Sequence, residues 1–151
     1  MASSPQGPCA LSFSLNPKRL NRTLHKQFGD FDLVETDKIS ESHRKIQAYF
    51  EGEIHALEKL PSAVRGTDFQ MKVWRALREV PPGQTRSYGD IARIINNPNA
   101  MRAVGMANNA NPLGLVIPCH RVIGADGKLT GYAGGLDIKR RLLKHEGLSF
   151  P

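Results

Sequence analysis

Hydrophobic residues show little regular spacing near the N-terminus of the chain. The pattern there predicts only two short strands, at residues 11–15 and 31–36. Residues 1–17 contain several Ser, Pro and Gly and are expected to form a disordered leader. Helical periodicity begins near Ser40 and predicts one helix that ends at Gly52.

From Gly66 onward the hydrophobic spacing is helical and the helix boundaries are well marked. Thr67 and Gln70 have the spacing of a capping box, which satisfies backbone N–H groups at a helix start. Apolar residues then recur every three or four positions, until Pro81-Pro82-Gly83 ends the pattern. One amphipathic helix is therefore predicted before residue 81.

Two shorter helices follow and are expected to form a helix-turn-helix. Ser87 and Asp90 mark the start of the first, residues 96–99 form the turn, and the second covers residues 100–109. The second helix consists mainly of small residues and carries one long charged side chain, Arg102. A helix that reads bases in the major groove usually presents several long polar side chains. The pattern therefore favours close approach of the backbone to a narrow groove, with Arg102 as the probe.

The last part of the chain combines an apolar segment, a turn-rich segment and a helix. Residues 113–117 predict a short strand that leads into Cys119. Residues 122–130 predict a hairpin or wing. A basic amphipathic helix is expected over residues 136–145, with Gly147 at its C-terminal cap.

Charge is unevenly distributed along the 151 residues, whose formal net charge is +7. Residues 66–151 hold 12 Lys and Arg against 6 Asp and Glu, whereas residues 1–65 hold 9 against 8. A basic half favours an acidic polymer such as nucleic acid as partner. No apolar run reaches the ~20 residues of a membrane span, and no secretory signal is recognisable, so an intracellular protein is expected.

The two cysteines have different sequence surroundings. Cys9 lies in the predicted leader, and a disulfide between Cys9 and Cys119 is not expected in a reducing compartment. No CxxC pair or histidine cluster has the spacing of a metal site, so neither a metal nor another cofactor is expected.

Cys119 is the candidate nucleophile because His120 follows it directly. A thiol reacts as the thiolate, and His120 could reach the sulfur in a turn or through one water. A carboxylate is then expected to orient the imidazole and to favour its protonated form, and Glu146 is the candidate. The Cys-His pair alone leaves open a structural alternative, with a buried packing cysteine and a surface histidine.

Short motifs elsewhere in the chain decide between these alternatives. The most specific motif is Ile117-Pro118-Cys119-His120-Arg121-Val122. It is accompanied by Gly66-Thr67-x-Phe69-Gln70, Ser87-Tyr88, Arg102-Ala103-Val104-Gly105, Asn111-Pro112, Gly131-Tyr132-x-Gly134-Gly135 and His145-Glu146-Gly147. In this combination the chain resembles the O6-alkylguanine-DNA alkyltransferases (methylated-DNA–protein-cysteine methyltransferases), especially the bacterial type. The resemblance extends from about Ser40 to Gly147.

The resemblance implies catalytic roles, position by position. Cys119 would accept the alkyl group, activated through water by His120, with Glu146 behind the imidazole. Asn111 would hold the turn before the active-site strand against the helix-turn-helix. Tyr88 would help to rotate the target nucleotide out of the duplex and would donate a proton to the leaving guanine.

The resemblance also implies contacts with DNA and with the base. Arg102 would enter the base stack and fill the place of the extruded nucleotide, while Tyr88 acts on the nucleotide itself. Contacts with the DNA backbone would be made by Gln70, Gly89 and Asn97. The guanine pocket would be lined by Val122, Tyr132 and Ala133.

The fold and function that the resemblance implies are specific. An α+β fold is expected, in which an abbreviated N-terminal region (1–65) precedes a C-terminal winged helix-turn-helix-like alkyltransferase domain (66–151). The reaction would be a single, irreversible transfer of a methyl or alkyl group from O6-alkylguanine, and from O4-alkylthymine, in double-stranded DNA to Cys119. A monomer is expected, in the cytoplasm of a bacterium or the nucleus of a eukaryote.

The chain departs from the family pattern at two pocket positions. Ala133 stands where relatives often have Ser, and Gly114 where some have Pro, which implies a looser pocket. Two other functions compete with repair. An alkyltransferase-like protein that binds damaged bases without repairing them would commonly have Trp in place of Cys119, and in a winged-helix transcription factor Cys119 would be incidental.

Overall fold

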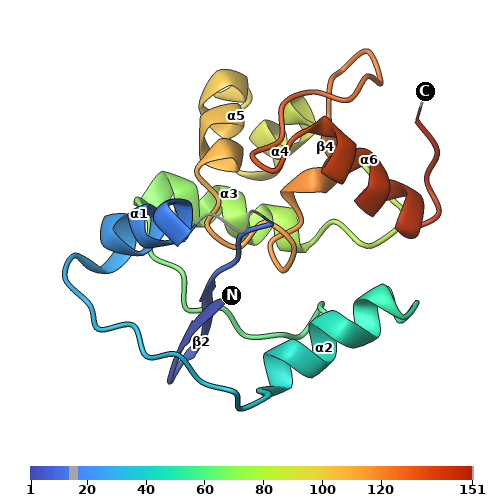
Figure 1. The fold of residues 1–151 in the computed structure, drawn as a ribbon. Helices are drawn as coiled ribbons and strands as arrows, with labels where there is room; N and C mark the ends of the chain where they lie inside the picture. Colours follow the sequence, from blue (N-terminus) through green and yellow to red (C-terminus); the bar gives the residue numbers. More distant parts are fainter. Residues whose placement is uncertain (14–16, 151) are drawn as a thin grey trace.

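The computed structural model describes residues 1–13 and 17–150 and shows the mixed α+β fold expected from the sequence (Figure 1). Its elements are β1 (Ala2–Ser4), β2 (Gly7–Ala10), α1 (Pro17–Phe28), α2 (Glu41–Phe50), α3 (Asp68–Arg78), β3 (Arg86–Ser87), α4 (Tyr88–Ile94), α5 (Met101–Asn109), the 3-10 turn η1 (Cys119–Arg121), β4 (Val122–Ile123) and α6 (Leu136–His145). No helix in the described ranges is long and apolar enough to span a membrane.

The N-terminal segment is folded, so the expectation of a disordered leader was wrong for residues 1–13. Strands β1 and β2 form an antiparallel hairpin, with Ala2 opposite Ala10. Helix α1 covers this hairpin and buries Leu24 against Cys9 and Ala10, with Leu20 and Phe28 at the edge. The hairpin was missed because its residues are small and do not alternate between apolar and polar.

The two predicted N-terminal strands are also wrong. Leu11 makes only an isolated bridge to Leu113, and residues 31–36 have no regular secondary structure. Residues 14 and 15 of the first predicted strand lie outside the described residues. The Leu11 backbone N–H donates to Pro112 O (2.9 Å), so this segment ties the hairpin to the C-terminal region.

The helix boundaries predicted from capping residues are confirmed. The Thr67 side chain accepts from Gln70 N–H while Gln70 accepts from Thr67 N–H, and Ser87 and Asp90 form the second capping box. Helices α4 and α5 make the expected helix-turn-helix, and Asn96 in its turn has a positive φ of 57°. The indole N–H of Trp74 donates to Ala107 O (2.9 Å), which fixes α3 against α5.

The segment before η1 is not the predicted strand. Asn111 Nδ2 donates to Ile117 O (2.8 Å), Asn111 Oδ1 accepts from Leu113 N–H (3.0 Å), and Ile117 N–H donates to Leu113 O (2.9 Å). These bonds close the segment into turns, because an Asn side chain can replace backbone partners that a strand would need.

The predicted hairpin after η1 forms only a turn. Gly124 N–H donates to Lys128 O (2.9 Å), but β4 pairs in parallel with β3 instead of with a neighbouring strand. This parallel pair joins the start of the helix-turn-helix directly to the end of η1. The Cys119 turn and the helix-turn-helix therefore share one scaffold.

Candidate active site

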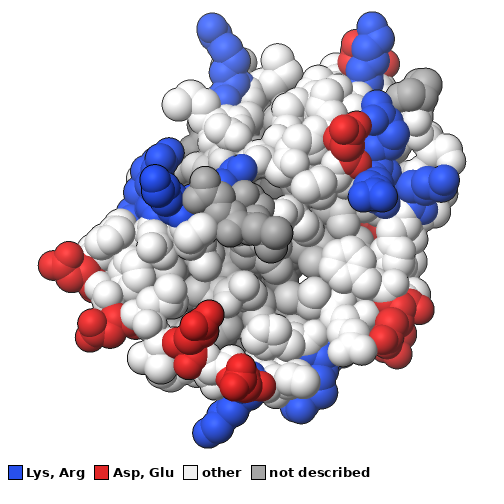
Figure 2. Space-filling view, viewed as in Figure 1, with Lys and Arg blue, Asp and Glu red and all other residues white. Residues whose placement is uncertain are grey.

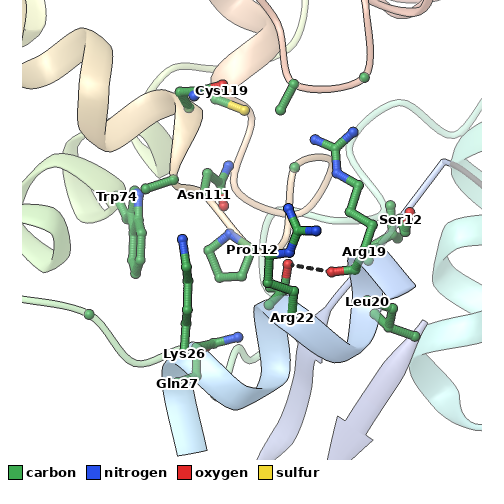
Figure 3. A pocket seen from close by; sticks show the side chains of 18 of the residues that line it. Ser12, Arg19, Leu20, Arg22, Lys26, Gln27, Trp74, Asn111, Pro112 and Cys119 are labelled. Atoms are coloured by element: carbon green, nitrogen blue, oxygen red, sulfur yellow. Dashed lines mark hydrogen bonds between the residues drawn. The ribbon is translucent and has the colours of Figure 1, made fainter. Parts of the chain in front are cut away.

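Cys119 lies at the start of η1, where its thiol borders a pocket of about 1090 Å³. The side chain is buried, with 5% of its surface exposed. Asn111 and Gly114 line the pocket beside it, and a Cβ on Gly114 would lie 3.9 Å from Cys119 Sγ. Figure 3 shows Cys119 at one end of the pocket and helix α1 at the other. The thiol is thus sheltered from solvent, yet open to a bound molecule.

Glu146 accepts hydrogen bonds from three residues on two elements, η1 and α2. His120 Nε2 lies 2.9 Å from Glu146 Oε1, which also accepts from the Tyr49 hydroxyl (2.8 Å). Arg121 donates through Nε to Oε2 (2.9 Å) and through Nη2 to Oε1 (2.7 Å). Burial alone would raise the pKa of Glu146, but the bonds from His120 and Arg121 outweigh it and lower the pKa to about 2. Glu146 is therefore ionised and accepts hydrogen bonds only.

The carboxylate fixes which nitrogen of His120 carries the proton. Because an ionised carboxylate cannot donate, His120 Nε2 must be protonated toward Glu146, and a neutral ring then has a free lone pair on Nδ1. His120 Nδ1 is buried and has no hydrogen-bond partner among the described groups. This tautomer leaves Nδ1 free to accept a proton, and because Cys119 Sγ does not bond to it, a proton from the thiol would have to pass through a water.

The resting charge of His120 is set by burial and by the charged groups around it. Burial lowers the pKa of His120, and this effect, with the nearby charges of Arg121 and Lys139, outweighs the opposing influence of Glu146. Glu146 does favour the protonated form, as predicted, but the imidazole is neutral at rest because burial has the larger effect. Arg121, which already neutralises Glu146, is the main partner that the sequence argument left out.

Cys119 is a thiol in the resting protein. Burial raises its pKa to about 11, although a hydrogen bond from the Asn111 side chain and the charge of Lys139 act in the opposite direction. Lys139 is fully buried in α6, and its Nζ donates to Val122 O (2.5 Å) and Thr130 O (2.8 Å). A reaction at Cys119 thus requires removal of its proton by a neighbouring base.

The predicted pocket and backbone-contact residues fall into two groups. Tyr132, Ala133 and Gln70 line the pocket with Cys119, and the Tyr132 hydroxyl donates to Gly114 O (2.8 Å). Val122 is fully buried and does not line the pocket; its carbonyl holds Lys139 instead.

Apart from Gln70, the residues predicted to act on DNA lie on the helix-turn-helix and do not line the pocket. Arg102 and Asn97 are exposed, and Gly89 is partly buried at the start of α4. The Tyr88 ring packs near Gly105, and its hydroxyl accepts from Thr130 Oγ1 (3.1 Å). Tyr88 does not line the pocket that Cys119 borders.

Three participants in the site were missed from the sequence: Tyr49, Arg121 and Lys139. The Tyr49 hydroxyl and the Arg121 guanidinium bind Glu146, and Arg121 Nη1 also donates to Val80 O (2.6 Å). Arg121 did have a sequence signal, because it belongs to the motif around Cys119, whereas Lys139 could not be told apart from the neighbouring charged residues of its helix. Within residues 1–13 and 17–150, no group of three or more His, Cys, Asp or Glu could hold a metal ion.

The fold and site define a class of helix-turn-helix protein in which a buried cysteine, followed by a histidine bound to a carboxylate, borders a pocket. A sequence model described as "6-O-methylguanine DNA methyltransferase, DNA binding domain" matches residues 68–148. The methylated-DNA–protein-cysteine methyltransferase of Methanosarcina acetivorans is 59% identical over 107 residues, which are 71% of this chain and 68% of that protein. The chain therefore belongs to the methylated-DNA–protein-cysteine methyltransferase family.

Solved structures agree with this assignment. The O6-methylguanine methyltransferase of Mycobacterium tuberculosis superposes with a TM-score of 0.73 and 39% identity, over 99% of this chain and 92% of that one. A structure of Mycobacterium tuberculosis OGT in complex with DNA matches with a TM-score of 0.65 and 51% identity, over 70% of this chain and 65% of that one.

Proposed function

We propose that this protein repairs double-stranded DNA by moving a methyl or other alkyl group from O6 of guanine to Cys119. Family membership supports the reaction, and the observation that carries it to this residue is the placement of Cys119. Its thiol borders a pocket, and His120 follows it in the chain. Glu146 fixes the tautomer of the His120 imidazole, which leaves Nδ1 buried and without a partner among the described groups. O4-alkylthymine, which presents an alkyl group on a comparable oxygen, is the second expected substrate.

The reaction begins with extrusion of the damaged nucleotide, because the alkyl group is hidden inside the duplex. Arg102, exposed on the second helix of the helix-turn-helix, enters the stack and offsets part of the unstacking cost. Gln70, Gly89 and Asn97 hold the backbone, and Tyr88 turns the nucleotide toward the pocket that Tyr132 and Ala133 line.

Transfer is then an in-line displacement at carbon. The thiol proton passes through one water to His120 Nδ1, and a sulfur lone pair forms the new S–C bond. The C–O6 bond breaks with its electron pair on O6, so guanine leaves as an oxyanion that accepts a proton; Tyr88 is the donor we propose. The thioether is stable, and each molecule acts once.

The cellular setting follows from the chemistry. A free acceptor thiol requires a reducing compartment, so we place the protein inside the cell, acting as a monomer on DNA. All of these roles fall within the proposed domain of residues 66–151, with residues 1–65 as a separate region.

The test is the intact mass of the protein after incubation with a duplex that contains one O6-methylguanine. We expect a gain of one methyl group per molecule, and no second gain when more duplex is added. Cys119→Ala should bind the duplex without gaining mass. Binding by the wild type with no gain in mass would instead identify a protein that recognises damage but does not repair it.

A further inference from the structure

Helix α1 is strongly basic, although residues 1–65 as a whole are nearly neutral. Its sequence, PKRLNRTLHKQF, includes Lys18, Arg19, Arg22 and Lys26 and no acidic residue. The acidic residues that balance them follow in the exposed segment after the helix, at Asp30, Asp32, Glu35 and Asp37. Figure 2 shows blue side chains over α1, whereas the red side chains of this face lie mostly in its lower half. Residues 1–65 are thus nearly neutral in sum but strongly basic at one place.

The basic side chains of α1 face the pocket that contains Cys119. Arg19, Arg22 and Lys26 line this pocket, and Figure 3 shows them pointing from α1 toward the wall that carries Asn111 and Cys119. All three are exposed, and none forms an ion pair with any described residue. The lining that the structure describes contains no Asp or Glu. The pocket therefore offers uncompensated positive charge next to the site of transfer.

A second observation supports this arrangement. Arg19 lines the same pocket as Tyr132, which lies in the wall proposed to hold the guanine. Burial raises the pKa of Tyr132, and the charge of Arg19 lowers it, so the positive charge of α1 is felt at that wall. Gln70 and Thr67, at the start of α3, line the pocket as well. Gln70 is one of the proposed contacts with the DNA backbone, so the basic face of α1 continues that surface.

We propose that α1 is a second DNA-binding element, in which Arg19, Arg22 and Lys26 bind phosphates of the damaged strand beside the extruded nucleotide. The proposal rests on the proposed repair function. The damaged strand is the occupant because it is continuous with the nucleotide that enters the pocket. Residues 19, 22 and 26 share one face of the helix and span about 10 Å along its axis, which is about three nucleotides of a B-form strand. Attraction of these phosphates would favour the extruded state.

The test compares two double variants that each remove two positive charges. In Arg22→Ala/Lys26→Ala the charges are removed from the pocket face of α1. In Arg44→Ala/Lys144→Ala they are removed from exposed positions on α2 and α6 that do not line the pocket. Dissociation constants for an O6-methylguanine duplex are measured across a range of salt concentrations. Each lost phosphate contact should reduce the steepness of log K against log [salt] by about 0.9. The slope of the α1 variant should therefore be smaller than that of wild type by about 2, and the slope of the control variant should be almost unchanged.

Single-turnover rates provide the second readout. At low salt the α1 variant should react with the duplex about tenfold or more slowly than wild type, and its loss with free O6-benzylguanine, which has no phosphate, should be smaller. Melting temperatures establish that both variants are folded. The role of α1 would be overturned if the salt slope were unchanged, or if the single-turnover rate fell equally with the duplex and with the free base. A wild-type protein that transfers no alkyl group would instead overturn the proposed function, while the slopes would still decide whether α1 binds DNA.

Discussion

The regions around Cys9 and Cys119 both contain a buried thiol, but only one is equipped for chemistry. The two side chains are 4% and 5% exposed, and burial raises the pKa of both thiols. Cys9 donates to Ala2 O (3.4 Å) and packs between the hairpin and α1. Cys119 borders a pocket and lies beside an oriented imidazole. Burial therefore does not distinguish a structural thiol from a reactive one; a neighbouring base and access for a substrate do.

The two regions also differ in how they are held together. Nineteen buried residues form the large core around Cys119, whereas four form the small core around Cys9. Buried apolar area is the main source of stability, so the N-terminal hairpin and α1 should open more readily than α3 to α6.

His120→Gln should give the largest change. Gln can still donate to Glu146, but it lacks the basic Nδ1, so the transfer rate should fall about 10²- to 10⁴-fold. Single-turnover rates across pH provide the check. Because the pKa of His120 lies below its usual range, the wild-type rate should stay level through neutral pH and fall only in acid. The variant rate should rise with pH as the thiol, with a pKa of about 11, ionises. Parallel profiles for the two proteins would remove His120 from the reaction.

Glu146→Gln should damage both stability and transfer. It leaves the buried Arg121 guanidinium without its charge partner, which typically costs about 3–5 kcal/mol. The exposed Glu53→Gln is the matched control and should melt like wild type. Since the pKa of Glu146 is lowered to about 2, its contribution to stability is complete above about pH 4.5 and is lost as the pH falls toward 2.

Denaturant unfolding at several pH values measures the free energy of unfolding. The difference in this free energy between wild type and Glu146→Gln should therefore become smaller in acid. A variant that melts much earlier but keeps the wild-type pH–rate profile would make Glu146 purely structural. It would then have no part in directing the proton of His120.

Arg102→Ala should impair repair in duplex DNA more than reaction with a free base. Extrusion of a nucleotide costs a few kcal/mol, and loss of the side chain that replaces it should slow the duplex reaction about ten- to a hundredfold. Free O6-benzylguanine needs no extrusion and provides the internal control. Equal losses on the two substrates would indicate that Arg102 supports the fold.

Leu24→Ala should have the smallest effect, and it should stay within the N-terminal region. Removing this buried side chain from a small core should cost about 2 kcal/mol, at the low end for such changes. Hydrogen exchange should show faster exchange in α1 with little change in α3. The exposed Leu33→Ala is the control. Equal loss of protection in α1 and α3 would show that the two regions unfold as one unit.

The C-terminal region could be predicted from sequence because its boundaries depend on local chemistry. The capping residues Thr67 and Ser87, and Gly147 after α6, mark helix ends through bonds with neighbours only a few positions away. Cys119 and His120 could be predicted as site residues because they are adjacent in one short motif. The Asn111 turn was mistaken for a strand because apolar runs do not reveal side chains that replace backbone partners.

The remaining errors have different physical causes. Helix α1 did carry a signal, since Leu20, Leu24 and Phe28 recur every four residues after Pro17, a residue favoured at a helix start. Arg121 and Tyr49 could not be found this way, because their bonds to Glu146 join residues 25 and 97 positions apart. The neutral state of His120 depends on its burial and on the charges of Arg121 and Lys139, which the sequence does not show to be close to it.

The most direct test of the account is to locate the transferred methyl group. Wild-type protein is reacted with a duplex carrying O6-methylguanine, digested, and mapped by mass spectrometry, alongside Cys9→Ala and Cys119→Ala. We expect one methyl group per molecule, all of it on Cys119, in wild type and in Cys9→Ala, and none in Cys119→Ala. Methylation of Cys9, or transfer that survives in Cys119→Ala, would contradict the assignment of the reactive thiol.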